Sequence, residues 1–139
     1  MTIGFIKADT NPGGDFEYIS LDGELPFIID GGGPVISTGQ KGHLVVPDAC
    51  TITGWTVLAD QSGSIVVDVW KDTYANFPPT VADTIAGSEK PTLSSVQKNQ
   101  DLTLTTWTTA LAKGDVLAFN VDSATTVTRV LVSLRVTRP

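Results

Sequence analysis

Few side chains in this sequence could serve as a nucleophile or a base. His43 is the only histidine and Cys50 the only cysteine among 139 residues. Nucleophilic catalysis needs a base beside the nucleophile, and the sequence contains no GxSxG, HExxH or Cys/His metal-binding spacing. We therefore expect His43 to be a structural or surface residue and Cys50 to be a buried thiol. We predict no catalytic residues, no cofactor and no enzymatic activity.

The acidic residues offer two weaker alternatives. A glycosidase needs two carboxyl groups about 5–9.5 Å apart, and Asp68 and Asp72 are close in sequence. A lone aspartate on a strand is more often a hydrogen-bonded or solvated residue, so we do not predict a catalytic pair. Residues 60–63 and 9–15 offer oxygen ligands in turns, yet neither segment matches an EF-hand loop. We predict no metal site and leave calcium open.

One group of residues has the composition of a ligand-binding surface. Aromatic rings can stack on a sugar while amide and carboxylate groups bind its hydroxyls, and residues 70–77 supply both kinds of side chain. The candidate contact residues are Trp70, Asp72, Tyr74, Asn76 and Phe77. The alternative, which we favour, is that these aromatic rings fill the core and hold the loop in place. We expect Trp55 and Trp107 to be core or interface residues for the same reason.

Charge and hydropathy exclude two classes of partner. The net charge is −6 and the sequence pI is about 4.4, whereas binding to nucleic acid phosphates needs clustered Lys and Arg. The apolar runs are far shorter than the ~20 residues that span a bilayer, and the first fifteen residues lack the pattern of a signal peptide. We therefore expect synthesis in the cytoplasm, no binding of nucleic acid and no membrane insertion.

The chain divides at the glycine run 31–33. Pro34 follows this run where a phosphate-binding loop would continue into a helix, so we interpret the run as a hinge. Six carboxylates precede the hinge against one cation, Lys7. We predict that residues 1–33 form an extended docking arm, or alternatively edge strands of the main domain, and that residues 34–139 form a single β-sandwich domain.

The strongest β signal lies in residues 49–71, ACTITGWTVLADQSGSIVVDVWK. Two β-rich runs flank residues 60–63, whose composition is typical of turns, so we predict a hairpin. Gly54 predicts a bulge in the first run. The second run, residues 63–71, has apolar residues on both faces. It is therefore either a central strand covered on both sides or a strand with one face at a subunit interface.

The rest of the chain continues the β pattern around one irregular region. Prolines 78, 79 and 91 make residues 72–92 a long loop. Further strands are expected in residues 43–46, 101–106, 107–111, 116–121 and 129–136. Leu117, Phe119 and Val121 should face one way, and Val130, Val132, Leu134 and Val136 should face inward. The spacing predicts an all-β fold, an antiparallel jelly-roll-like β-sandwich, with an immunoglobulin-like topology as the alternative.

The order and spacing of particular residues along the chain are also informative. Residues 49–85, ACTITGWTVLADQSGSIVVDVWKDTYANFPPTVADTI, are followed by KPTLSS and by WTTALAKGDVLAFNVDSATTVTRVLVSLRV. Together they resemble a module of bacteriophage tail, fibre and minor structural proteins, over residues 39–137. The features that carry the resemblance are Trp55, residues 68–71, residues 77–79, Pro91 and residues 114–117. The resemblance implies a virion component and supplies no catalytic residues.

The resemblance and the arm together suggest a role. We expect a non-enzymatic virion structural protein, a capsid decoration or the head of a head or tail fibre, bound to other virion proteins through residues 1–33. By analogy with decoration proteins, a homo-oligomer is expected and a trimer favoured. The alternative is a receptor-binding module that recognises a host surface glycan through the residue 72–92 loop.

Overall fold

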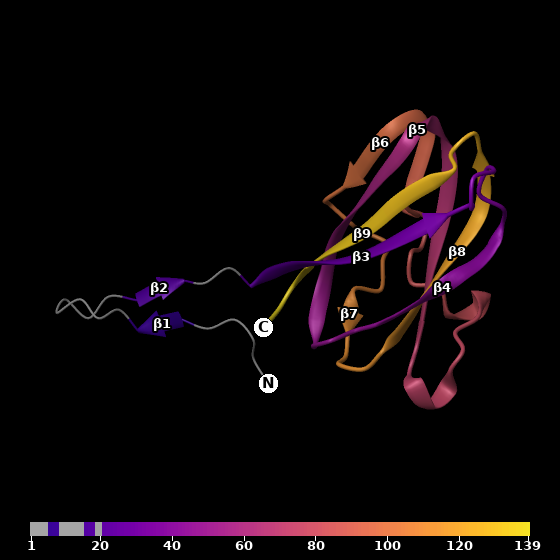
Figure 1. The fold of residues 1–139 in the computed structure, drawn as a ribbon. Coiled ribbons are helices and arrows are strands. Elements are labelled where there is room, and N and C mark those ends of the chain that lie inside the picture. The colour runs from indigo at the N-terminus through magenta and orange to yellow at the C-terminus, as the bar shows by residue number, and fades with distance from the viewer. Residues whose placement is uncertain (1–5, 9–15, 19–20) are drawn as a thin grey trace.

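The computed structural model describes residues 6–8, 16–18 and 21–139. The described residues form β-strands and two short 3-10 turns, which confirms the all-β prediction (Figure 1). The strands are β1 (Ile6–Ala8), β2 (Phe16–Tyr18), β3 (Asp22–Asp30), β4 (Gly39–Val45), β5 (Cys50–Asp72), β6 (Thr92–Asp101), β7 (Ala110–Leu111), β8 (Val116–Thr125) and β9 (Arg129–Thr137), and the turns are Tyr74–Asn76 and Val81–Asp83. Among these residues, no helix is long and apolar enough to cross a membrane.

The strands form two antiparallel sheets of very different size. β1 pairs with β2. The other seven strands form one curled sheet in the order β3-β9-β5-β8-β4, and β6 and β7 pair with the second edge of β5. β5 therefore has neighbours on both edges, which satisfies its backbone N–H and C=O groups in the interior.

β5 is one bent strand of 23 residues, and the predicted hairpin is wrong. Residues 51–59 pair with β9 and residues 64–72 pair with β8, so the two runs follow one another instead of pairing together. The turn-like residues between them bend the strand through a corner, because each run already has a partner strand. The predicted bulge at Gly54 is confirmed by a register shift between Ile52 and Gly54.

Side chains from β5 hold this corner against the connection between β8 and β9. The Asp60 carboxylate accepts hydrogen bonds from the Thr128 hydroxyl at 2.6 Å and from the backbone N–H groups of Thr128 and Arg129, both at 3.1 Å. Gln61 Nε2 donates to the carbonyl of Thr126 at 3.1 Å. A Cβ atom on Gly63 would lie 2.7 Å from the Thr125 carbonyl oxygen, so only glycine permits this approach. These contacts explain why a turn-like sequence lies inside a strand.

The corner folds the sheet so that its two halves face each other. We call β3, β9 and residues 50–59 of β5 the first half, and residues 63–72 of β5 with β8 and β4 the second half. Phe27 from β3 stacks on Phe119 from β8 with ring centroids 4.4 Å apart, which joins the two halves across the interior.

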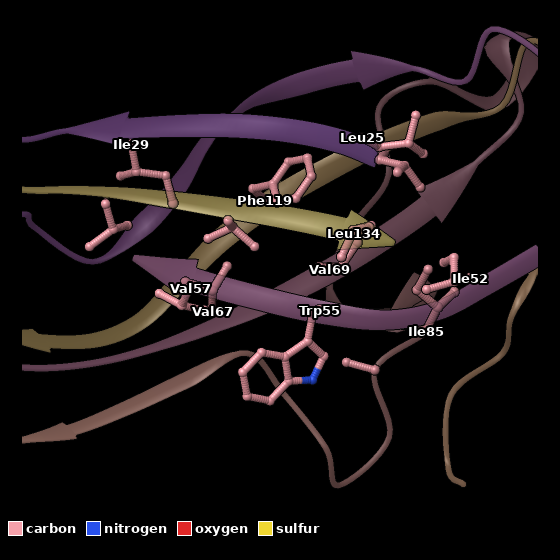
Figure 2. Packing of buried hydrophobic residues seen from close by; sticks show 14 of the residues in the cluster. Leu25, Ile29, Ile52, Trp55, Val57, Val67, Val69, Ile85, Phe119 and Leu134 are labelled. Atoms are coloured by element: carbon pink, nitrogen blue, oxygen red, sulfur yellow. The ribbon is translucent and has the colours of Figure 1, made fainter. Parts of the chain in front are cut away.

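The core lies between the two halves (Figure 2). It includes all of the residues expected to face inward on β8 and β9, which are buried. They are Leu117, Phe119, Val121, Val130, Val132, Leu134 and Val136. Trp55 and Trp107 are also buried, as is Cys50, whose pKa burial raises. These predictions are confirmed because alternating apolar residues in paired strands point to one side of the sheet.

The outer face of the second half is partly covered. Val116 and Ala118 point away from the core, yet both are buried, whereas Val45 opposite Val116 is exposed. Residues 73–91 reach this face, where Phe77 packs against His43 and Lys90 pairs with Asp122. Thr84 forms a β-bridge with Trp70, and the N–H of Ile85 donates to the carbonyl of Val69 at 2.9 Å. The two-faced pattern of residues 63–71 is therefore that of a central strand covered on both sides.

Two further expectations differ from the structure. Residues 101–106 are largely irregular, and the strand in this region is β6, which ends at Asp101. Residues 94–100 of β6 are all exposed, and all except Val96 are polar. The sequence therefore has no alternation of apolar residues that would predict this strand. At the N-terminal side, residues 22–30 are not part of an arm. They form β3, which pairs along its whole length with β9 at the edge of the sheet and contributes Leu25 to the core, in agreement with the alternative of edge strands. Residues 1–5, 9–15 and 19–20, with the turn at 9–15, lie outside the described residues.

The corner predicts a pH dependence for folding. The hydroxyl of Thr128, followed by the backbone N–H groups of Arg129 and Thr128, lowers the pKa of Asp60 to about 2. An unfolded aspartate titrates near about 3.9, so the stabilisation is present above about pH 4 and is lost as the pH falls towards 2. We expect Asp60→Asn to lower stability at pH 6 and to flatten the decline between pH 4 and pH 2, measured by urea unfolding. Parallel pH profiles for the two proteins would contradict this assignment.

Candidate binding surface

Two of the five candidate contact residues make hydrogen bonds that stabilise the fold, and the other three lie on the surface. The Trp70 indole N–H donates to Asp68 Oδ2 at 3.0 Å, and Asp72 Oδ1 accepts from the N–H of Thr73 at 2.8 Å. Both residues thus hold the end of β5 and the start of the loop. Tyr74, Asn76 and Phe77 lie together on the exposed turn that follows.

This turn presents aromatic rings to solvent. Tyr74 is 83% exposed and Phe77 is 49% exposed, so the expectation that they fill the core is wrong. The buried residues of the loop are instead Pro79, Ile85, Ala86 and Pro91. Phe77 packs edge-on against the exposed ring of His43, with centroids 4.7 Å apart. We call Tyr74, Asn76, Phe77 and His43 the aromatic surface.

The loop is fixed to the sheet by a polar network that centres on Asp68. This aspartate is only 2% exposed. Its Oδ1 accepts hydrogen bonds from the Thr84 hydroxyl and from the N–H of Val69. Lys90 Nζ lies 3.6 Å from Asp68 Oδ2 and 2.7 Å from Asp122 Oδ2, so the lysine bridges the two carboxylates. The hydrogen bond to Asp122, supported by the charge of Asp68, raises the pKa of Lys90.

Glu89 is a second anchor of the same loop. The indole N–H groups of Trp55 and Trp107 both donate to its backbone carbonyl, each at 2.9 Å. Its side-chain carboxylate accepts hydrogen bonds from the hydroxyl and the N–H of Thr106 and from the N–H of Thr105. The Thr106 hydroxyl, followed by the Thr106 N–H, lowers the pKa of Glu89. These bonds replace strand pairing in residues 102–109, which is why the strand expected there is absent.

Sequence reasoning missed both anchors because their partners are distant in the chain. Asp68, Lys90 and Asp122 lie in three different segments of the chain, so their spacing in the sequence does not show that they pair. Of the two turns that suggested calcium, only residues 60–63 are described, and there the Asp60 carboxylate accepts hydrogen bonds from Thr128 and Arg129. Within the described ranges, no group of three or more His, Cys, Asp or Glu residues is placed to hold a metal ion.

Comparison with known proteins gives little further information. No family model matches the chain, and no curated protein matches it. Among solved structures, a chain of the "Cyanophage Pam1 capsid asymmetric unit" is similar at 15% identity, with 98% of this chain and 86% of that chain covered and a TM-score of 0.25. A likeness at this level does not establish a shared fold.

The Asp68 network predicts unequal effects for the two carboxylates that share Lys90. Asp68→Ala should lower the free energy of unfolding by about 3 kcal/mol, because it leaves the Trp70 and Thr84 donors without their acceptor in a part-buried site. Asp122→Ala, which removes a more exposed partner of the same lysine, should cost less than about 1 kcal/mol. Urea unfolding at pH 7 measures both values, and equal losses would contradict the central position of Asp68.

Proposed function

We propose that this chain is a non-enzymatic structural protein of a bacteriophage particle. In this proposal it is a surface accessory of the virion, a capsid decoration or the head of a head or tail fibre, and it binds other virion proteins through its N-terminal segment. The curled sheet would then serve as a jelly-roll-like head. A homo-oligomer is part of the proposal. Analogy with decoration proteins favours a trimer, whereas the exposed sheet face described below favours a two-fold contact, and the mass of the protein in solution decides between them.

The proposal rests on the positions, in the structure, of the residues that carry the resemblance to phage proteins. The indole of Trp55 holds Glu89, Asp68 holds Thr84 and Lys90, and the carbonyl of Pro91 accepts the N–H of Val67 at 2.9 Å. Residues 114–117 continue this pattern, because the N–H of Gly114 donates to the carbonyl of Val46 at 2.8 Å and β8 begins at Val116. Apart from Phe77, which is 49% exposed, the residues that carry the resemblance thus hold the fold together, which supports a structural role.

Part of the N-terminal segment proposed for docking belongs to the sheet and is therefore not free to dock. β3 spans Asp22–Asp30 and supplies Leu25 and Ile29 to the core, so these residues are needed for the fold. The Gly31 N–H also donates to the carbonyl of Thr128 at 2.8 Å, which places the glycine run at the corner of the sheet. We therefore assign docking to residues 1–20 rather than to the whole of residues 1–33.

Deletion of residues 1–20 tests this assignment. The shortened chain should keep the thermal unfolding midpoint of the full chain within a few degrees, because β3 is intact, and should fail to sediment with particles that lack the protein. A deletion of residues 1–33 is the matched comparison, and it should unfold because it removes β3. If the chain without residues 1–20 decorates particles as fully as the intact chain, docking does not use this segment.

The exposed aromatic surface favours a second candidate function, the recognition of a host surface glycan. Tyr74 and Phe77 present ring faces and edges to solvent, and Asn76 and His43 add hydrogen-bonding groups. An aromatic ring that stacks on a sugar loses little conformational entropy on binding, whereas the adjacent polar groups select among hydroxyls.

Single substitutions separate this candidate from a purely structural loop. Tyr74→Ala should weaken binding to host cells or immobilised surface polysaccharide at least tenfold and leave the unfolding midpoint unchanged, since this side chain is exposed. Val81→Ala, which alters another exposed residue of the same loop, is the control and should bind normally. Unchanged binding by the Tyr74 variant would rule out glycan recognition by this surface.

A further inference from the structure

The outer face of the first half carries a row of apolar side chains. Ile28 on β3 lies opposite Leu131 on β9, and Leu131 lies opposite Leu58 on β5. Directly opposed residues in paired strands point to the same side of a sheet, so the three side chains form a continuous row across three strands. Ile28 is 57% exposed, Leu58 is 45% exposed, and Leu131 is half-buried between them. We call these residues the Leu58 row.

The surface around the Leu58 row is hollowed rather than flat. Leu58 lines a hollow of about 550 Å³ with Val96 and Lys98, where residues 59–62 bulge away from β6. It also lines a second hollow of about 390 Å³ towards Gln100 and a third of about 200 Å³ towards Ile28 and Arg129. The apolar row thus stands beside depressions that side chains of a facing surface can fill.

This face differs from its counterpart on the second half. There, residues 73–91 lie against part of the sheet and Ala118 is fully buried, although Val45 on β4 is exposed. On the first half, the outward residues of β3 are all exposed, from Asp22 through Ile28 to Asp30. Figure 1 shows β3 and β9 side by side, and β9 is hydrogen-bonded to β5 along the next edge. Residues 73–91 therefore lie against part of one outer face of the sheet, and no segment within residues 21–139 lies across the other.

The charges on this face identify the kind of partner that it fits. The Leu58 row is flanked by three acidic and three basic exposed side chains, and Glu24 pairs with Arg135 at 3.1 Å. The six residues are Glu24, Asp30, Asp60, Lys98, Arg129 and Arg135. The whole chain carries a net charge of −6, so two copies repel each other over most of their surfaces. Among these six side chains the formal charges balance, and Asp22 at the start of β3 adds one further carboxylate to the face. The face is therefore close to neutral, and a second copy can approach with opposite charges in reach.

We propose that the outer face of the first half binds the same face of a second copy of this chain. The contact is a two-fold, isologous one in which the Leu58 rows pack together and the mixed charges form its rim. Sheets that pack face to face lie about 10 Å apart, which lets apolar side chains of one row enter the hollows beside the other. This proposal rests on the described face alone and does not depend on a role in a phage particle.

The mass of the full chain in solution tests the proposal. Sedimentation equilibrium from 1 to 100 µM should give a dimer for the wild type. Leu58→Glu should raise the dissociation constant at least about 30-fold, because it places a carboxylate at the centre of the apolar contact. Val45→Glu is the matched control, since Val45 is an exposed strand residue of the second half, and it should leave the dimer intact. Far-UV circular dichroism confirms that each variant is folded.

Several results would overturn the proposal. A monomeric wild type at 100 µM would show that the face has another occupant, such as a different virion protein, and a trimeric mass would contradict a two-fold contact. An oligomer that Leu58→Glu leaves intact would place the contact elsewhere. If Leu58→Glu fails to fold, Ile28→Lys tests the same row from the edge strand, where the side chain is more exposed, and must also weaken the dimer.

Discussion

The bend of β5 is the constraint on which this structure depends. The strand is hydrogen-bonded to β9 and then to β8 on one edge, and to β7, β6 and residues 84–91 on the other. Because its backbone groups are satisfied on both edges, the strand can run through the middle of the molecule. Its corner must be tight enough to bring the two halves of the sheet together. Asp60 and Gly63 meet that need, the first by capping free N–H groups and the second by allowing close backbone approach.

The long loop follows from the folded sheet. The outer face of the second half carries apolar residues such as Val116 and Ala118, which are buried. Residues 73–91 reach this face, and the loop stays in place through Asp68 and through the Glu89 carbonyl that Trp55 and Trp107 share. A loop with so little regular structure needs such anchors, since fixing an irregular backbone costs conformational entropy that strand pairing does not repay. The aromatic rings of Tyr74 and Phe77 remain outside because smaller residues of the loop occupy the buried positions.

The two outer faces of the sheet differ from each other. One face is partly covered by residues 73–91 and presents the aromatic surface at its edge, whereas the other presents the Leu58 row among charges of both signs. The two proposals use these different surfaces, one for a second copy and the other for a glycan. The buried Asp68 holds the loop, and the charged groups whose pKa values are shifted, Asp60, Glu89 and Lys90, hold the corner and the loop in place.

The sequence by itself determined the fold class and most of the core. Alternation in residues 116–121 and 129–136 predicts which side chains face inward, and the prolines of residues 77–91 predict the loop, because both signals act over a few neighbouring residues. The sequence also places Tyr74, Asn76 and Phe77 on one short segment, whereas His43 joins them only through the fold. Only the tertiary structure decided that residues 60–63 bend a strand instead of closing a hairpin, since this choice depends on Thr128 and Arg129, far along the chain. The same holds for the Lys90 bridge and for the Leu58 row, which exist only when separate strands come into register.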